Sequence, residues 1–190
     1  HKIIIDTDTG GDDSAALILA AKAPDVEILG VTVAAGNVSL RQATKNALQA
    51  LETAGCDAPV YPGAERPLSG EDRETFSVYG KDGMGDADLI HPKRRAKRKH
   101  AVDYILETVK KHPGEIEIVA LGPVTNIALA IQKDPETMKQ VRRIWSMGTA
   151  GFGPGNATPV AEFNVYKDAA AYQVMLELGV PVTVLGLDMD

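Results

Sequence analysis

Residues 6–13, with the sequence DTDTGGDD, form the part of the chain best equipped for chemistry. The aspartates in this cluster are Asp6, Asp8, Asp12 and Asp13. Carboxylates this close repel one another unless some stay solvated, carry protons or share a cation. Calcium and magnesium prefer oxygen ligands of this kind. Asp12 and Asp13 could instead cap a following helix, but capping explains only one or two of the acids, so the pattern favours a divalent-cation site.

The elements around this cluster place it at the end of a strand. Residues 3–5 are all isoleucine and show no polar alternation, which indicates a buried parallel strand, and residues 14–23 are rich in Ala and Leu, which indicates a helix. We expect further strands at 26–35, 59–61, 116–121, 141–147 and 180–187, and further helices at 38–54, 101–111, 127–132 and 169–178. This alternation predicts an α/β fold, an open and mostly parallel, Rossmann-like sheet with helices on both faces. Such sheets bind ligands at the carboxyl ends of their strands.

Other polar residues follow the later strands. Asn37 comes after the second strand and is equally well explained as a turn residue. Asn156, Glu162 and Asn164 lie within or just after a glycine-rich loop at 148–159. Together with the aspartates they offer only oxygen and amide groups, which suit a metal ion plus a polyhydroxylated ligand. A nucleophilic triad is poorly supported, because Ser14 is not in a Gly-x-Ser-x-Gly turn.

Length and composition narrow the class of protein. The 190 residues suffice for one domain, taken as 1–190, and the formal net charge of −6 argues against a nucleic-acid partner. No apolar run is long enough to span a bilayer and no signal-peptide pattern appears, so no membrane partner is expected. The lone Cys56 fits a reducing compartment, and we expect a cytoplasmic protein. Residues 62–99 lack periodicity and are predicted to be a mobile loop, with 79–86 as a flap over the site.

Four sequence blocks carry a resemblance to one family. These are the aspartate cluster at 6–13, Gly36-Asn37, the GPVTN block at 122–126 and the GNATPVAEFN block at 155–164. Their order and content closely resemble the inosine-uridine preferring nucleoside hydrolases, over residues 2–190. That family cleaves the N-glycosidic bond of ribonucleosides to ribose and a free base.

The resemblance implies a role for individual residues. Asp8, Asp13 and the backbone carbonyl of Thr125 would bind Ca²⁺, and Asp8 would also act as general base toward a calcium-bound water. Five further residues would hold the ribose hydroxyls: Asp12, Asn37, Asn156, Glu162 and Asn164. Met147 would lie close to the sugar. The implied partners are a small-molecule ribonucleoside and further copies of the chain, in a homo-oligomer of two or four.

The chain also departs from the family pattern. Family members are longer and carry a C-terminal His-Asp pair, the Asp binding calcium and the His assisting departure of the base; this chain ends before that region. Tyr79 stands where many members have His, and the loop after Met147 is one residue longer than in many members. Two readings follow, a fragment of a full enzyme or a short natural form with an incomplete calcium shell.

Two alternative functions remain at this stage. The chain could be a nucleoside- or ribose-binding module without turnover. It could also be a phosphotransferase, because Asp6-x-Asp8-Thr9 after a strand resembles the haloacid-dehalogenase motif, with Asp6 as nucleophile and magnesium as cofactor. The second alternative gives no role to Asp12, Asp13 or the 155–164 block.

Overall fold

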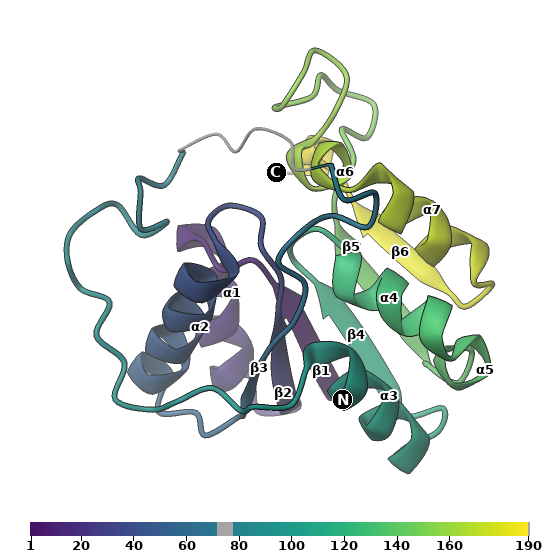
Figure 1. Cartoon of the computed structure of the whole chain (residues 1–190), viewed down its shortest axis with the longest axis horizontal. Helices are drawn as coiled ribbons and strands as arrows, with labels where there is room; N and C mark the ends of the chain where they lie inside the picture. The colour runs from purple at the N-terminus through teal and green to yellow at the C-terminus, as the bar shows by residue number, and fades with distance from the viewer. Residues whose placement is uncertain (72–77, 190) are drawn as a thin grey trace.

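The computed structural model describes residues 1–71 and 78–189, and its centre is a six-stranded parallel sheet (Figure 1). The strands lie in the order β3-β2-β1-β4-β5-β6. Their bounds are β1 Lys2–Thr7, β2 Glu27–Val33, β3 Val60–Pro62, β4 Ile116–Ala120, β5 Arg143–Met147 and β6 Val182–Leu185. Since the order reverses between β1 and β4, a crevice opens there at the carboxyl ends of these two strands. The predicted fold class is confirmed.

Helices cover both faces of this sheet (Figure 1). They are α1 Gly11–Lys22, α2 Leu40–Ala54, α3 Ala101–Lys111, α4 Thr125–Lys133, α5 Pro135–Met138, α6 Phe163–Lys167 and α7 Ala169–Glu177, followed by a 3₁₀ turn at Leu187–Met189. The helices α1 and α2 lie on one face, and α3, α4 and α7 lie on the other. Within β1, Ile3 and Ile5 pack into the core with Leu17 of α1, whereas Ile4 packs with Ile127 of α4. Burial on both faces explains the unbroken apolar run of β1.

The boundaries of several elements differ from the predictions. The first helix begins at Gly11 rather than at residue 14, so Asp12 and Asp13 lie in its first turn. At the ends of α2, Ser39 Oγ accepts from the Gln42 N–H and caps the helix, and Gly55 ends the helix at φ +67°. The short helices α5 and α6 were not predicted, because four or five residues are too few to show a helical period.

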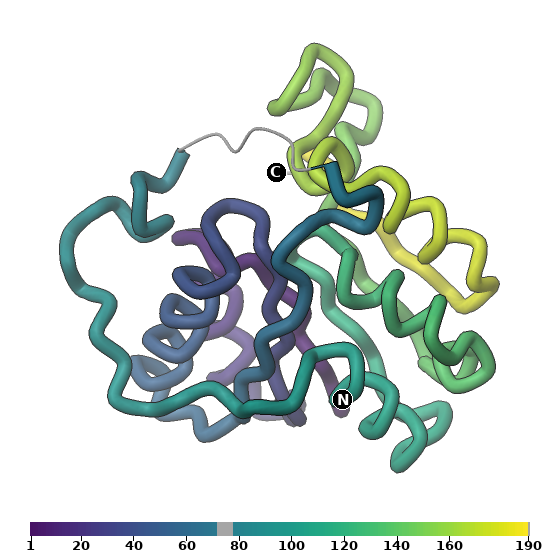
Figure 2. Tube along the Cα trace, viewed as in Figure 1, coloured from purple at the N-terminus to yellow at the C-terminus, as the bar shows by residue number. Residues whose placement is uncertain are grey.

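The predicted loop at 62–99 crosses the carboxyl edge of the sheet and then returns. Figure 2 shows residues 63–71 running from the end of β3 toward α6, and residues 78–100 passing along the outer side of α2 to α3. Part of the predicted flexible loop, 72–77, lies outside the described residues. In the basic run at 93–99, Arg94 donates to the carbonyls of Cys56, Asp57 and Ala58, which fixes the returning segment to the end of α2. Among the described residues, no helix has the length and apolar character needed to cross a membrane.

Candidate active site

A pocket of about 240 Å³ lies at the carboxyl ends of β1, β2, β4 and β5. It brings together residues that are up to 152 positions apart in the sequence, from Asp12 to Asn164. The predicted ribose-binding residues all line it: Asp12, Asn37, Met147, Asn156, Glu162 and Asn164. Asp13 also lines the pocket, whereas Asp8 and Thr125 are buried, with 1% and 2% of their surface exposed.

Asp8 follows β1 and is held between two glycines. A Cβ on Gly36 would lie 2.1 Å from Asp8 Oδ2, and a Cβ on Gly122 would lie 2.3 Å from Asp8 Oδ1, so no other residue type fits at either position without movement. Asp8 Oδ2 accepts the Asn37 N–H at 2.5 Å. In the part of the chain that the structure describes, Asp8 Oδ1 and Asp6 Oδ2 are the buried side-chain oxygens without a hydrogen-bond partner. Burial raises the pKa of Asp8 to about 7.

Asp13 lies in the first turn of α1 and faces the same carboxylate cluster. Its Oδ2 accepts the Gly10 N–H at 2.8 Å, which caps the helix, and its Oδ1 accepts the Thr7 hydroxyl at 3.0 Å. Burial, with the nearby charges of Asp8 and Asp12, raises the pKa of Asp13 well above its ordinary value. Asp13 therefore caps α1 and also lies close to the carboxylates of Asp8 and Asp12.

Glu162 and Asn164 enter the pocket from the short helix α6. Glu162 caps α6 by accepting the N–H groups of Asn164 and Val165 at 2.8 and 3.1 Å, and it also accepts the Thr149 N–H at 3.1 Å. Burial raises the pKa of Glu162, and these three N–H bonds oppose that rise. Asn164 Nδ2 donates to the Leu121 and Met147 carbonyls at 2.9 and 3.3 Å, which ties α6 to the ends of β4 and β5.

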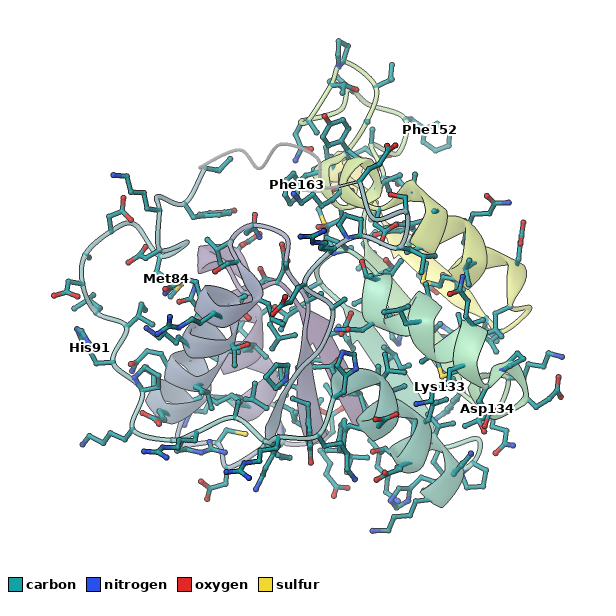
Figure 3. The ribbon with its side chains drawn as sticks, viewed as in Figure 1. Met84, His91, Lys133, Asp134, Phe152 and Phe163 are labelled. Atoms are coloured by element: carbon teal, nitrogen blue, oxygen red, sulfur yellow. The ribbon has the colours of Figure 1, made fainter. Side chains whose placement is uncertain are left out.

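The outer parts of the pocket come from two loops. Asn156 is exposed, and its Oδ1 accepts the Phe163 N–H at 2.8 Å, so the 148–161 loop folds back on the start of α6. Phe163, the first residue of α6, lies at this mouth, while Phe152 of the 148–161 loop projects outward (Figure 3). Asn37 is half-buried where β2 runs into α2. The sequence left Asn37 undecided between a site and a turn residue, and the structure places it in the pocket wall.

Tyr79 lies in the segment predicted as a flap over the site, and it lines the pocket, although the sequence assigned it no individual role. Its ring lies over the turn before α1, where a Cβ on Gly10 would lie 3.2 Å from Tyr79 Cδ2. Its hydroxyl hydrogen-bonds to Asp12, and burial with the adjacent carboxylates raises its pKa to about 12. The flap that carries it is fixed from below, because Asn46 Nδ2 donates to the Asp82 carbonyl and to the Thr9 carbonyl. Val78, Leu121 and Phe163 were also missed, because an apolar residue carries no signal that separates a pocket position from a core position.

The donor set fits a hard cation, although the side chains alone do not make a metal centre. Among the described residues, no three carboxylate, imidazole or thiol groups gather closely enough to hold a metal ion. Two buried aspartates, one with an oxygen that lacks a partner, provide negative charge that a cation would offset. Calcium also accepts backbone carbonyls as ligands, so Thr125 at the start of α4 can complete a set of three oxygen donors.

Comparison with known proteins decides the family. The model for "Inosine-uridine preferring nucleoside hydrolase" matches residues 3–190. The chain belongs to this family. The resemblance read from the four sequence blocks is thereby confirmed.

Relatives of known sequence and structure agree with this membership. The chain is 45% identical to uridine nucleosidase 1 of Arabidopsis thaliana over 191 aligned residues, covering 100% of the chain and 57% of that relative. A plant nucleoside hydrolase structure superposes with a TM-score of 0.93 at 40% identity, covering 98% of this chain and 60% of that one. A purine-preferring ribonucleoside hydrolase from Gardnerella vaginalis also gives 0.93, at 35% identity, covering 99% and 61%. The chain thus spans about three fifths of the length of these nucleoside hydrolases.

Proposed function

We propose that this site hydrolyses the N-glycosidic bond of ribonucleosides and releases ribose and a free base. The observation that carries the proposal is the single pocket in which Asp12, Asn37, Asn156, Glu162 and Asn164 gather over the buried Asp8. Family membership supports the reaction class. The relatives are named for pyrimidine and for purine substrates, so the proposal covers ribonucleosides of both kinds.

The proposed cofactor is Ca²⁺, held by Asp8, Asp13 and the Thr125 carbonyl. The Asp8 oxygen without a partner and the raised pKa values of both aspartates support a cation at this position. When bound, the ion would lower the pKa of a coordinated water and orient it. The haloacid-dehalogenase alternative is weaker, because it gives no role to Glu162 and Asn164, which line the same pocket as Asp12.

The remaining residues act on the water and the sugar. Asp8 accepts the proton of the attacking water, a role that the family resemblance gives it and that a carboxylate positioned beneath the pocket can fill. Cleavage passes through an oxocarbenium-like transition state, and the buried Glu162 carboxylate favours positive charge developing on the ribose. The ribose hydroxyls are held by Asp12, Asn37, Asn156 and Asn164, with Met147 against the sugar.

The test is ribose release from inosine and from uridine, with and without calcium after treatment with a chelator. We expect calcium-dependent ribose release, and loss of it in Asp8→Ala. Phosphate release from a generic phosphate ester would instead support the phosphotransferase. Nucleoside binding in calorimetry without ribose release would identify a binding module.

The homo-oligomer of two or four chains rests on the family resemblance alone. Light scattering at several protein concentrations tests it, and a monomer at every concentration would contradict it.

A further inference from the structure

Asp168 is a buried carboxylate that the proposed reaction does not use. Only 3% of its surface is exposed, and it lies between α6 and α7, outside the pocket lining. Its Oδ1 accepts the Ala171 N–H at 3.1 Å and caps α7. Its Oδ2 accepts the Thr125 hydroxyl at 2.6 Å and the Leu68 N–H at 2.8 Å. A helix cap needs only the first of these three bonds, so the other two call for a separate explanation.

Thr125 is the first residue of α4, and the turn that precedes it packs against Asp8. Gly122, three residues earlier, lies so close to Asp8 that a Cβ there would meet Asp8 Oδ1 at 2.3 Å. The Thr125 side chain points to Asp168 through its hydroxyl, while its backbone carbonyl belongs to the proposed calcium ligands. The orientation of that carbonyl therefore depends on how the first turn of α4 is held.

The next residue, Asn126, holds the same turn from the other side. Its Nδ2 donates to Asp6 Oδ1 at 2.9 Å, and its Oδ1 accepts the Ala64 N–H at 2.9 Å. Asp6 is in β1, two residues before Asp8. Two consecutive residues of α4 are thus bound by two buried carboxylates, one from the central strand and one from the start of α7.

We propose that Asp168 is a positioning residue for the cation site, acting through the Thr125 hydroxyl to set the Thr125 carbonyl toward Asp8. The inference rests on the proposed function, because it takes that carbonyl as a calcium ligand. Groups that orient metal ligands through one hydrogen bond typically change metal affinity by 10–100-fold when removed.

A matched control exists elsewhere in the chain. Thr137 in α5 is 4% exposed, and its hydroxyl donates to the Asp134 carboxylate at 2.7 Å, much as Thr125 donates to Asp168. Asp134 lies at the end of α4 away from the pocket residue Phe163 (Figure 3). Thr125→Val and Thr137→Val therefore each remove one threonine–aspartate bond at a buried threonine, although the Asp134 side chain is 29% exposed, and only the first bears on the site.

The experiment is calcium titration of the metal-free protein by calorimetry, with calcium as the only ligand. We expect the calcium Kd to rise roughly 10–100-fold in Thr125→Val, to return toward wild type in Thr125→Ser, and to stay unchanged in Thr137→Val. The melting temperature without calcium should fall in both valine variants, and less in Thr137→Val, whose aspartate partner is more exposed. Asp168→Asn, compared with Asp134→Asn, gives a second pair in case Thr125→Val does not fold, and a higher Kd is expected in Asp168→Asn alone.

The outcomes separate the two proposals. Calcium binding that Asp8→Asn abolishes, but that Thr125→Val leaves equal to Thr137→Val, overturns the positioning role and leaves the proposed function standing. A wild-type protein that binds no calcium overturns the proposed cofactor and the inference with it.

Discussion

The backbone N–H of Asn37 donates to Asp8 Oδ2 at 2.5 Å, so the segments that follow the adjacent strands β1 and β2 are joined directly. Asp8 follows β1, and Asn37 lies beyond the end of β2. This bond fixes one oxygen of the proposed base and leaves the other, Oδ1, toward Gly122 and without a partner. Asn37 thus has two roles, because its side chain lines the pocket while its backbone orients the acid beneath it.

Adding a methyl group beside Asp8 should disable the site. In Gly122→Ala the new Cβ would lie 2.3 Å from Asp8 Oδ1, so the carboxylate or the turn must shift. Overpacking of this kind typically costs about 1–3 kcal/mol of unfolding free energy, and we expect nucleoside hydrolysis to fall well beyond that stability loss. Gly153→Ala is the control, since its Cβ would meet only an ordinary contact at 3.6 Å. Equal activity of the two variants in a ribose-release assay would contradict the close approach.

Neutralising Asp8 should stabilise the metal-free protein while abolishing activity. The pKa of Asp8 is raised from 3.8 to about 7 in the fold, so the native state binds more protons than the unfolded state between these values. The contribution of Asp8 to stability therefore falls as pH rises from about 4 to about 7, and stays low above that. At 1.36 kcal/mol per pKa unit, Asp8→Asn gains at most about 4 kcal/mol at pH 7.5. Chemical denaturation of both proteins at pH 4.5 and 7.5 measures this, and a wild type more stable than the variant at pH 7.5 contradicts it.

Calcium should narrow that difference in stability. A ligand that binds only the folded protein stabilises it by about 2.7 kcal/mol at 100 times its Kd. We expect calcium to raise the melting temperature of wild type, and to leave that of Asp8→Asn unchanged. Magnesium at the same concentration is the comparison, because it demands a stricter octahedral geometry. A similar shift in both proteins would indicate a calcium site elsewhere.

Replacing Glu162 by Gln should separate its charge from its capping role. The Gln side chain keeps one acceptor oxygen for the N-terminus of α6, so the unfolding free energy should drop by less than the ~1 kcal/mol typical of a lost cap. Loss of the carboxylate should lower kcat by about 10²-fold or more, in line with removal of one preorganised electrostatic group. Asp134→Asn, a cap that accepts the Thr137 N–H at 3.0 Å outside the pocket, should leave kcat unchanged. Wild-type kcat in Glu162→Gln would remove Glu162 from the mechanism.

The sequence predicted which polar residues meet in one pocket, although it misplaced some boundaries of the elements that carry them. Buried strands such as β1 show continuous apolar runs, and polar residues at their ends identify the crevice without knowledge of the fold. The start of α1 was placed three residues late, because the glycines and aspartates that open it are poor helix formers held there by the Asp13 cap. The individual place of Tyr79 in the pocket could not be predicted beyond its membership of the 79–86 flap, since it depends on the path of a long loop.

The pocket residues fall into two sets, those fixed to the sheet and α1 and those carried by loops. Asp8, Asp13 and Asn164 are tied by hydrogen bonds to backbone or threonine groups at the ends of the central strands and α1, whereas Tyr79 and Asn156 are carried by loops that cross over them. A substitution at Tyr79 or Asn156 would therefore leave in place the hydrogen bonds that fix Asp8, Asp13 and Asn164.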